Sequence, residues 1–373
     1  METKLQNLAN IVSGQSPKSE FYSKSEGIPF LQGNRTFGVL YPAIDTFTTN
    51  VTKLAKKNSI LMSVRAPVGD LNFANRDICI GRGLASIESR DGDNTFLFYA
   101  LKFNMPNLIK QGAATTYDAV NSDLLKEFVL TIPDQAENRT KVGELLFSID
   151  SQIELNSRII SKLHDYLEFL YQRILFSNND SHGESGSSKN LSKVWEKKLL
   201  SDILEVKTGK RDANFADAEG SYKFFTCSEE ILRCASFAFE GSAVLLAGNG
   251  NFNIKLYEGK FDAYQRTYVL MPIDKRLIPL VYLAVKDRIT SLASGSRGSI
   301  VKFITKGDIE DIDIWIPSDL ESKELSHFND LIKQINLLSD ENNYLEDFKN
   351  WMLPSLFLSK ISINLSKSLK GLH

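Results

Sequence analysis

The sequence is poor in features that mark secreted, membrane-bound or metal-binding proteins. It has three cysteines in 373 residues (Cys79, Cys227 and Cys234), and its first residues do not resemble a signal peptide. Such a chain is typical of the reducing cytoplasm, and no disulfide framework is expected. No apolar run reaches the ~18 residues of a membrane-spanning helix, so we expect no membrane contact. Cys227 and Cys234 have the wrong spacing for a structural zinc site, and we expect no bound metal.

The chain also lacks an excess of positive charge and the short motifs of common enzymes. Lys and Arg number 44 against 46 Asp and Glu, which gives a formal net charge of −2. Nucleic-acid binders are often basic overall, so any DNA affinity has to come from locally placed cations. There is no Walker phosphate loop, no Asn-Pro-Pro-Tyr amino-methylation motif and no Gly-rich cofactor loop after a predicted strand. We therefore expect a non-catalytic chain that binds no cofactor directly.

What the chain does have is a long internal repeat. The segment Leu8–Gln15 returns as Ile203–Lys210, and the run Val129–Pro133 returns as Ile312–Pro317. The period of roughly 185–195 residues is far above the ~20–50 residues of solenoid repeats. A long helical pattern follows each Ile-Pro, so the repeating unit is a globular domain plus a long helix.

Composition divides the chain into six segments. Short β-rich runs separated by Gly, Pro and Asn turns, with one apolar helix in each half, favour an α+β fold for both globular parts. The polar stretch after the first long helix is typical of a flexible linker. The predicted segments are globular domain 1 at 1–134, helix 1 at 135–176, the linker at 177–194, globular domain 2 at 195–318, helix 2 at 319–358 and a C-terminal tail at 359–373.

The two long helical patterns carry apolar heptads with one asparagine each. Asn156 falls at a d position of the first, and Asn342 at an a position of the second. Because a faces d in an antiparallel pair, placing these asparagines opposite each other sets the register and aligns apolar residues at almost every layer. The one mismatch is Ile149 against Lys349, and we expect Lys349 to reach the rim of the pair. The alternative is that each helix packs on its own domain with its asparagine exposed.

This organisation resembles the specificity subunit of type I restriction–modification systems over essentially the whole chain. The resemblance lies in Leu8–Gly14 and its copy Trp195–Gly209, in Ile28–Gly33 and in Leu61–Gly69. It implies two repeated target-recognition domains that each read one half of a bipartite double-stranded DNA site. The two long helices, of ~50–60 Å at ~1.5 Å per residue, would form an antiparallel coiled coil that separates the domains.

The resemblance also implies partners that carry the chemistry. The paired helices would dock two methyltransferase (M) subunits, and nuclease–translocase (R) subunits would join through the complex. S-adenosylmethionine, Mg and ATP are then expected on those partner subunits rather than on this chain.

Candidate DNA-contacting residues are basic or polar side chains near glycines, because cations and amides bind phosphates while a few side chains reach base edges. We rank Arg82 and Arg266 first, because they precede similar runs in the two halves. Arginine prefers guanine O6 and N7, and asparagine or glutamine prefers adenine N6 and N7. The other candidates are Arg65, Asn34, Arg35, Thr115, Thr116, Tyr117, Lys207, Lys210, Arg211, Asn249, Asn251, Ser296 and Arg297.

Two alternatives stay open at this point. One is a structural scaffold that holds two protein-binding domains apart and has no salt-sensitive affinity for DNA. The other is a stand-alone enzyme of unrecognised type, which would turn over substrate without partners.

Overall fold

The computed structural model describes residues 1–113, 120–179, 195–250, 252–295 and 303–358. The chain divides into two compact units, unit 1 with Met1–Ile159 and Leu338–His373, and unit 2 with Ile160–Leu337. Each unit thus joins one globular domain to a part of both long helices, a division that the predicted linear segments did not contain. Within the described ranges, no helix has the length and apolar character needed to cross a membrane.

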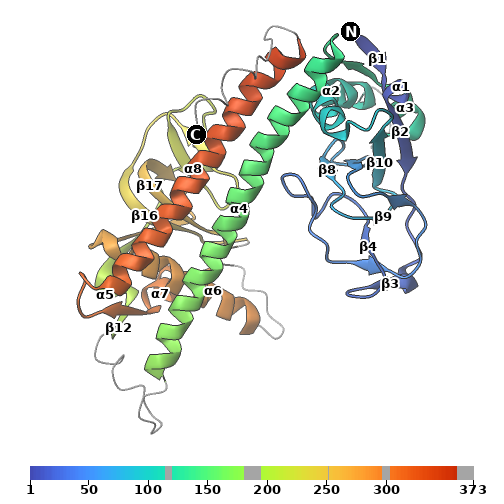
Figure 1. The fold of residues 1–373 in the computed structure, drawn as a ribbon. Helices are drawn as coiled ribbons and strands as arrows, with labels where there is room; N and C mark the ends of the chain where they lie inside the picture. The colour runs from blue at the N-terminus through green and yellow to red at the C-terminus, as the bar shows by residue number, and fades with distance from the viewer. Residues whose placement is uncertain (114–119, 180–194, 251, 296–302, 359–373) are drawn as a thin grey trace, which may run out of the picture. The chain divides into compact units, whose positions relative to one another are not determined.

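Unit 1 is an α+β domain with two small sheets (Figure 1). One sheet has the strand order β2-β10-β7-β8 and the other β3-β5-β4-β9-β6, while β1 pairs with β11. The elements are β1 (Glu2–Lys4), α1 (Leu5–Leu8), β2 (Ala9–Ser13), β3 (Tyr22–Ser23), β4 (Ile28–Leu31), β5 (Phe47–Thr48), β6 (Leu54–Ala55), β7 (Ile60–Ser63), β8 (Leu71–Phe73), β9 (Ile78–Ile80), β10 (Leu84–Ser89), α2 (Asn94–Ala113), α3 (Ser122–Glu127) and β11 (Val129–Thr131).

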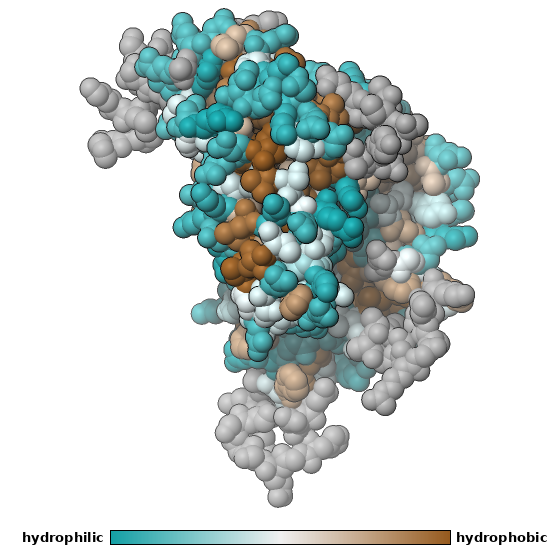
Figure 2. Space-filling model, turned by 90° about the vertical axis from the view of Figure 1, so that its right-hand side faces the viewer, coloured by the Kyte–Doolittle hydropathy of each residue, from teal (hydrophilic) through white to brown (hydrophobic). Residues whose placement is uncertain are grey.

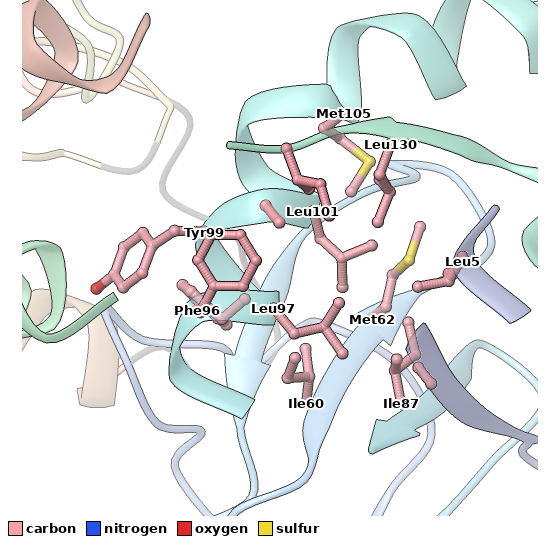
Figure 3. Packing of buried hydrophobic residues seen from close by; sticks show 14 of the residues in the cluster. Leu5, Ile60, Met62, Ile87, Phe96, Leu97, Tyr99, Leu101, Met105 and Leu130 are labelled. Carbon is pink, nitrogen blue, oxygen red and sulfur yellow. The ribbon is translucent and has the colours of Figure 1, made fainter. Parts of the chain in front are cut away.

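The core of unit 1 lies between α2 and the first sheet (Figure 3). Leu97 and Leu101 of α2 point towards Ile60 and Met62 of β7, and all four side chains are buried. The strands are short apolar runs that end at glycines or polar turns, as expected for elements buried on at least one face. This packing gives the loops at the strand ends a rigid support.

Unit 2 repeats the same plan with one larger sheet of order β13-β18-β16-β17-β14-β15, and with β12 paired to β19. Its single long strand β17 occupies the place of both β8 and β9 in unit 1, because it pairs antiparallel with β16 and parallel with β14. The elements are β12 (Trp195–Leu199), α5 (Leu200–Ile203), β13 (Leu204–Thr208), β14 (Tyr222–Phe225), β15 (Leu232–Cys234), β16 (Phe239–Ala247), β17 (Ile254–Ala263), β18 (Thr267–Pro272), α6 (Ile278–Gly295), α7 (Lys306–Glu310) and β19 (Asp313–Pro317).

The long helices are α4 (Ala136–Asn179) and α8 (Lys323–Phe357). Helix α4 continues three residues into the predicted linker, and the rest of that linker and the predicted tail at 359–373 lie outside the described residues. In each unit a part of α4 lies beside a part of α8 in the opposite direction (Figure 1). The predicted antiparallel pairing is thereby confirmed within each unit.

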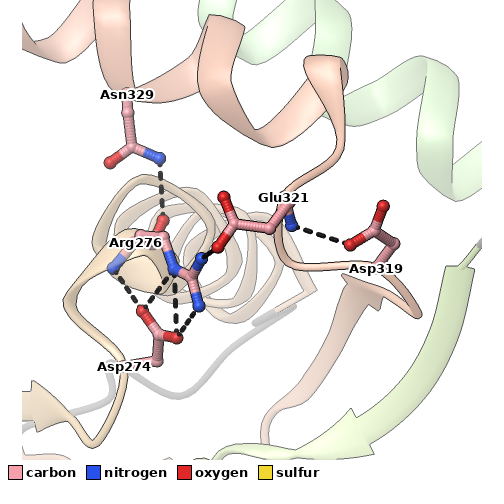
Figure 4. Close-up of polar contacts among 5 residues, drawn as sticks. All are labelled: Asp274, Arg276, Asp319, Glu321 and Asn329. Atoms are coloured by element: carbon pink, nitrogen blue, oxygen red, sulfur yellow. Dashed lines mark hydrogen bonds and ion pairs between the residues drawn. The ribbon is translucent and has the colours of Figure 1, made fainter.

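A cluster of polar contacts around Arg276 holds the beginning of α8 against the domain of unit 2 (Figure 4). Arg276 donates to both carboxylate oxygens of Asp274 and also forms an ion pair with Glu321, in the turn before α8. Asn329 of α8 donates to the Arg276 carbonyl oxygen at 2.9 Å. These bonds seat the first turns of α8 on the segment that leads into α6.

Candidate nucleic-acid interface

The two units build the same tight turn where the repeat predicts related structure. In unit 1 the Leu84 amide donates to the Gly81 carbonyl at 3.0 Å, and in unit 2 the Thr267 amide donates to the Tyr264 carbonyl at 2.8 Å. The first turn connects β9 to β10 and the second connects β17 to β18, and both face the end of the strand that carries the repeated glycine motif. The Gly14 amide donates to Leu84 at 2.9 Å.

The glycine of the repeated motif is explained by this close approach. In unit 2 the Gly209 amide donates to the Thr267 carbonyl at 3.1 Å, which is the counterpart of the bond from Gly14 to Leu84. A Cβ atom on Gly14 would lie 2.2 Å from the Gly81 carbonyl oxygen, and one on Gly209 would lie 1.9 Å from the Ala263 carbonyl oxygen. No side chain fits at either place without moving backbone, so both halves require glycine.

The hydrogen-bond register corrects the predicted match between Arg82 and Arg266. Since Leu84 corresponds to Thr267, Arg82 corresponds to Gln265, and Arg266 corresponds to Gly83. The sequence alignment was therefore wrong by one position, because it matched apolar runs without the register of the sheets. The turn in unit 1 exposes Arg82 at its second position, whereas the turn in unit 2 exposes Arg266 at its third position.

A cleft of about 740 Å³ lies beside the turn of unit 1. Arg82 is exposed at this cleft, and no ion pair is recorded for it with any described residue. Arg35 also lines the cleft, where it forms an ion pair of 2.5 Å with Asp45. The hydrogen bond from Arg35 holds the pKa of Asp45 below its usual value. The other residues that line the cleft are Gln15, Ser16, Pro17, Lys18, Ser19, Tyr22, Phe30, Leu31, Gln32, Gly33, Thr36 and Thr46.

Unit 2 has a smaller cleft of about 430 Å³ at the corresponding turn. Arg266 and Gln265 are exposed there, and the Gln265 amide donates to Asp212 at 3.0 Å. Asn249, two residues after the end of β16, lines the same cleft beside Phe303, whose side chain is 66% exposed. Guanidinium, amide and aromatic groups gathered on an open surface are suited to phosphate and base contacts.

Several other predicted residues are already engaged within the protein. Asn34 donates to Asp70 at 2.5 Å, and Lys207 lies 3.5 Å from Glu205 on the exposed face of β13. Arg211 donates to the fully buried carboxylate of Asp262 at 3.2 Å, and its guanidinium stacks over the Phe215 ring at 4.2 Å. Arg211 therefore has a structural role, because it compensates a buried charge that would otherwise be unpaired.

Besides Arg82 and Arg266, two more predicted cations are exposed and free of recorded ion pairs within the described residues. Arg65 follows β7 and Lys210 follows the repeated glycine, and neither has an ion pair recorded within the described ranges. Thr115, Thr116, Tyr117, Asn251, Ser296 and Arg297 lie outside the described residues. Contact between DNA and any of the named residues stays a prediction.

The predicted asparagine register is confirmed in unit 1. Asn156 donates to the Asn342 side-chain oxygen at 3.0 Å, and Asn342 donates to Ser157 at 3.3 Å. Gln152 donates to Asn156 at 2.9 Å, so the buried amide has partners for both its oxygen and its nitrogen. A buried polar layer of this kind disfavours other registers, because a shift would leave the amides without partners.

The expectation that Lys349 reaches the rim is wrong. Its side chain is 2% exposed, and its ammonium group forms ion pairs of 2.5 Å with Asp150 and 2.6 Å with Glu346. Tyr99 of α2 donates to the second oxygen of Asp150 at 2.8 Å. Burial by itself would lower the pKa of Lys349, but the Asp150 carboxylate and the bonds to Asp150 and Glu346 outweigh it and raise the pKa above its usual value.

A second apolar pattern runs along both helices. Large apolar side chains reach the surface of the protein, as brown patches among hydrophilic residues illustrate (Figure 2). With Asn156 at d and Asn342 at a, the exposed large apolar residues in the described parts of α4 and α8, and just after α8, all fall at heptad positions c or g. They are Leu155, Ile159, Tyr166, Phe169 and Phe176 on the first helix and Leu337, Tyr344, Phe348, Trp351 and Leu358 on the second.

In an antiparallel pair the g positions of the two helices flank the same side of the seam. The exposed apolar residues at c and g in each unit therefore lie on one side of the seam, and we call them the c/g face. In unit 1, the rings of Tyr344 and Phe348 stack with centroids 6.2 Å apart, and those of Phe348 and Trp351 with centroids 6.0 Å apart. Heptad analysis of the a/d seam alone missed this face, although the sequence contains its pattern.

The described residues contain no group of His, Cys, Asp and Glu able to hold a metal ion. The fold defines a protein with two α+β domains of the same plan, each joined to a part of a helix pair and each with a cleft beside the repeated turn. The chain belongs to the family of the type I restriction modification DNA specificity domain, whose model matches residues 1–165 and 192–347.

The relatives are specificity subunits. The chain is 46% identical over 135 residues to the type I restriction enzyme EcoDI specificity subunit of Escherichia coli, a match that covers 36% of this chain and 30% of that protein. It is 39% identical over 151 residues to the putative MjaX specificity subunit of Methanocaldococcus jannaschii, covering 40% of this chain and 35% of that protein. The matches thus span about a third of the length of these relatives.

A solved structure is similar over nearly the whole chain. It is the crystal structure of a type I restriction-modification system S subunit from M. genitalium, with a TM-score of 0.65, 17% identity and coverage of 96% of both chains. At this identity the likeness concerns the fold. It agrees with the predicted α+β class, the two repeated domains and the long antiparallel helices.

Proposed function

We propose that this chain is the DNA sequence-specificity subunit of a type I restriction–modification enzyme, in which each globular domain reads one half of a bipartite double-stranded site. The observation that carries the proposal is the repeated turn, which presents an exposed arginine beside a cleft in both units: Arg82 in unit 1 and Arg266 in unit 2. With a net charge of −2, the chain has to bind phosphates through such local cations.

The test is to remove each arginine separately and measure binding to duplexes with either half-site altered. Arg82→Ala and Arg266→Ala should each weaken binding by about 1–3 kcal/mol and relax selection at one half-site only. Arg158→Ala is the matched control, since Arg158 is an exposed arginine on α4 that pairs with Glu154. Equal loss at both half-sites would contradict the assignment of one domain to one half-site, and salt-insensitive binding would favour the scaffold alternative.

The c/g face supports the proposal that the long helices dock methyltransferase subunits. Contiguous aromatic side chains on the surface of a protein commonly mark an interface with another protein. In unit 1 Tyr344 is 70% exposed and Trp351 is 66% exposed, although both belong to a helix whose other face is buried. Two such faces, one in each unit, fit a complex with two methyltransferase subunits, through which nuclease–translocase subunits would join.

Trp351→Lys tests this face without touching the buried seam. Loss of a central aromatic anchor costs about 2 kcal/mol or more at protein interfaces, so co-purification with the methyltransferase subunit should be lost or greatly reduced. Asn343→Lys adds the same charge at an exposed position of the same helix outside c and g, and should leave the complex intact. Retention of the complex by Trp351→Lys would place the docking site elsewhere.

In this assignment the chain recognises DNA and its partners perform the chemistry. S-adenosylmethionine would bind the methyltransferase subunits, and Mg and ATP the nuclease–translocase subunits, with no cofactor held by this chain. The two helices would set the separation of the two half-sites, as domain spacing does in other two-domain DNA readers. Methyl transfer to DNA by the purified chain alone would contradict this division of labour.

A further inference from the structure

The cleft of unit 1 contains a polar network that the family assignment does not explain. Gln32 follows β4, Ser16 follows β2, Tyr22 begins β3 and Arg82 lies in the repeated turn, and all four line the same cleft. The side chain of Gln32 is exposed, so its amide is accessible to a ligand in the cleft. Its backbone is firmly placed, because its carbonyl accepts from the Gly83 amide at 3.2 Å.

The hydrogen bonds of this network have a direction. The Arg82 backbone amide donates to the Ser16 hydroxyl oxygen at 3.2 Å, which leaves the hydroxyl proton for another partner. That partner is the Gln32 side-chain oxygen, 3.0 Å away. The Tyr22 hydroxyl lies 3.4 Å from the same oxygen and 3.2 Å from the Pro17 carbonyl, so it can donate to either.

The network therefore orients the amide of Gln32. Its oxygen accepts from Ser16 and lies within reach of the Tyr22 hydroxyl, and no hydrogen bond is recorded for its NH₂ group within the described ranges. A free glutamine presents both an acceptor and a donor, and so pairs with the N6 and N7 atoms of adenine. The oxygen of an amide has two lone pairs, and donation from both Ser16 and Tyr22 engages both of them, so that Gln32 then presents donors alone.

We infer that Gln32 reads a base in the first half-site and selects guanine, with Ser16 as the positioning residue that makes the amide a donor. This inference rests on the proposed function. Guanine offers two adjacent acceptors in the major groove, O6 and N7, whereas thymine offers the single acceptor O4 beside a methyl group, cytosine offers the N4 donor and adenine pairs an acceptor with a donor. The corresponding position in unit 2 is Thr226, because the backbone bond from Gly81 to Leu31 matches that from Tyr264 to Phe225. The two half-sites are therefore read by different chemistry at this point.

Two variants test the inference from opposite directions. Ser16→Ala releases a lone pair of the Gln32 oxygen, so the preference for guanine over adenine at one position should fall on the order of 10-fold. Gln32→Glu replaces the donors by acceptors, so selection should move from guanine towards cytosine. The readout is selection from a randomised bipartite duplex library by the full chain bound to its methyltransferase subunit, followed by sequencing.

The control is Gln135→Glu, which adds the same charge at an exposed glutamine before α4, outside the cleft. It should leave the base profile unchanged. If the parent complex selects no bipartite sequence, the proposed function fails. If it does, but Ser16→Ala and Gln32→Glu leave every position unchanged or weaken all sequences equally, Gln32 does not read a base and this inference alone is overturned.

Discussion

The buried lysine of α8 allows a quantitative test of how the helix pair is joined to the first domain. Lys349 occupies a core a position, where its ammonium group is 2.5 Å from Asp150, and both side chains are nearly inaccessible to solvent. Tyr99 links the same carboxylate to α2 through a bond of 2.8 Å. The network thus connects α4, α8 and the globular domain within unit 1.

Replacing Lys349 by Met keeps the volume but leaves the buried Asp150 carboxylate without its main compensating charge. Breaking a buried ion pair in this way costs about 3–5 kcal/mol. The triple change Lys349→Met, Asp150→Leu and Tyr99→Phe removes the charge, its partner and the hydroxyl that would otherwise be left unsatisfied. Replacing a whole buried network by apolar residues is often neutral or stabilising, so the free energy of unfolding of this variant should be close to that of the parent.

The assay measures the free energy of unfolding in urea by circular dichroism. Tryptophan substitutions placed in unit 1 or in unit 2 allow the unfolding of each unit to be monitored separately. If Lys349→Met alone lowers the free energy of unfolding by less than about 1 kcal/mol, the reasoning is refuted, because Asp150 would then be reached by water or another cation. An independent readout is the dependence of stability on pH in the alkaline range. The pKa of Lys349 is raised in the folded protein, so its contribution is fully present below about pH 10.5 and is lost as pH rises further. In the triple variant this alkaline loss should be smaller.

Two further predictions concern the repeat and the register. Gly14→Ala and Gly209→Ala should each destabilise the protein by about 1–3 kcal/mol in thermal unfolding, because their Cβ atoms would lie 2.2 Å and 1.9 Å from carbonyl oxygens, whereas Gly33→Ala, which has open space, should have little effect. Replacing Asn156 and Asn342 together by Leu should leave stability equal or higher, but allow helix registers that the parent excludes. Disulfide trapping between cysteines placed one heptad out of register would detect these alternative registers. Unchanged stability of the two glycine variants, or a register that stays unique without the asparagines, would contradict these expectations.

Patterns that depend on neighbouring positions along the chain could be read from the sequence. The asparagine pair was predictable because heptad spacing alone places Asn156 and Asn342 in one layer, and the structure joins them at 3.0 Å. The repeated glycines were visible as a motif, although their reason, a carbonyl within 2.2 Å of each missing Cβ, was not.

Contacts between elements could not be predicted in the same way. Lys349 had no evident partner, because Asp150 lies outside the a/d seam and Tyr99 comes from a separate helix. The predicted match of Arg82 with Arg266 was wrong by one residue. The register of the sheets decides which turn positions correspond, whereas the apolar runs that follow the two arginines do not. The network of Ser16, Tyr22 and Gln32 joins three strand ends that are unrelated in sequence pattern.

The sequence by itself determined the duplication, the α+β class, the two long helices and the register of their pairing, because these follow from periodic burial along one chain. The tertiary structure alone decided which polar groups meet: the buried Lys349–Asp150 pair, the partners of Arg211 and Asn34, and the direction in which the Gln32 amide points. Such contacts form between residues far apart in sequence, where geometry rather than spacing decides whether a charge is paired or free to bind.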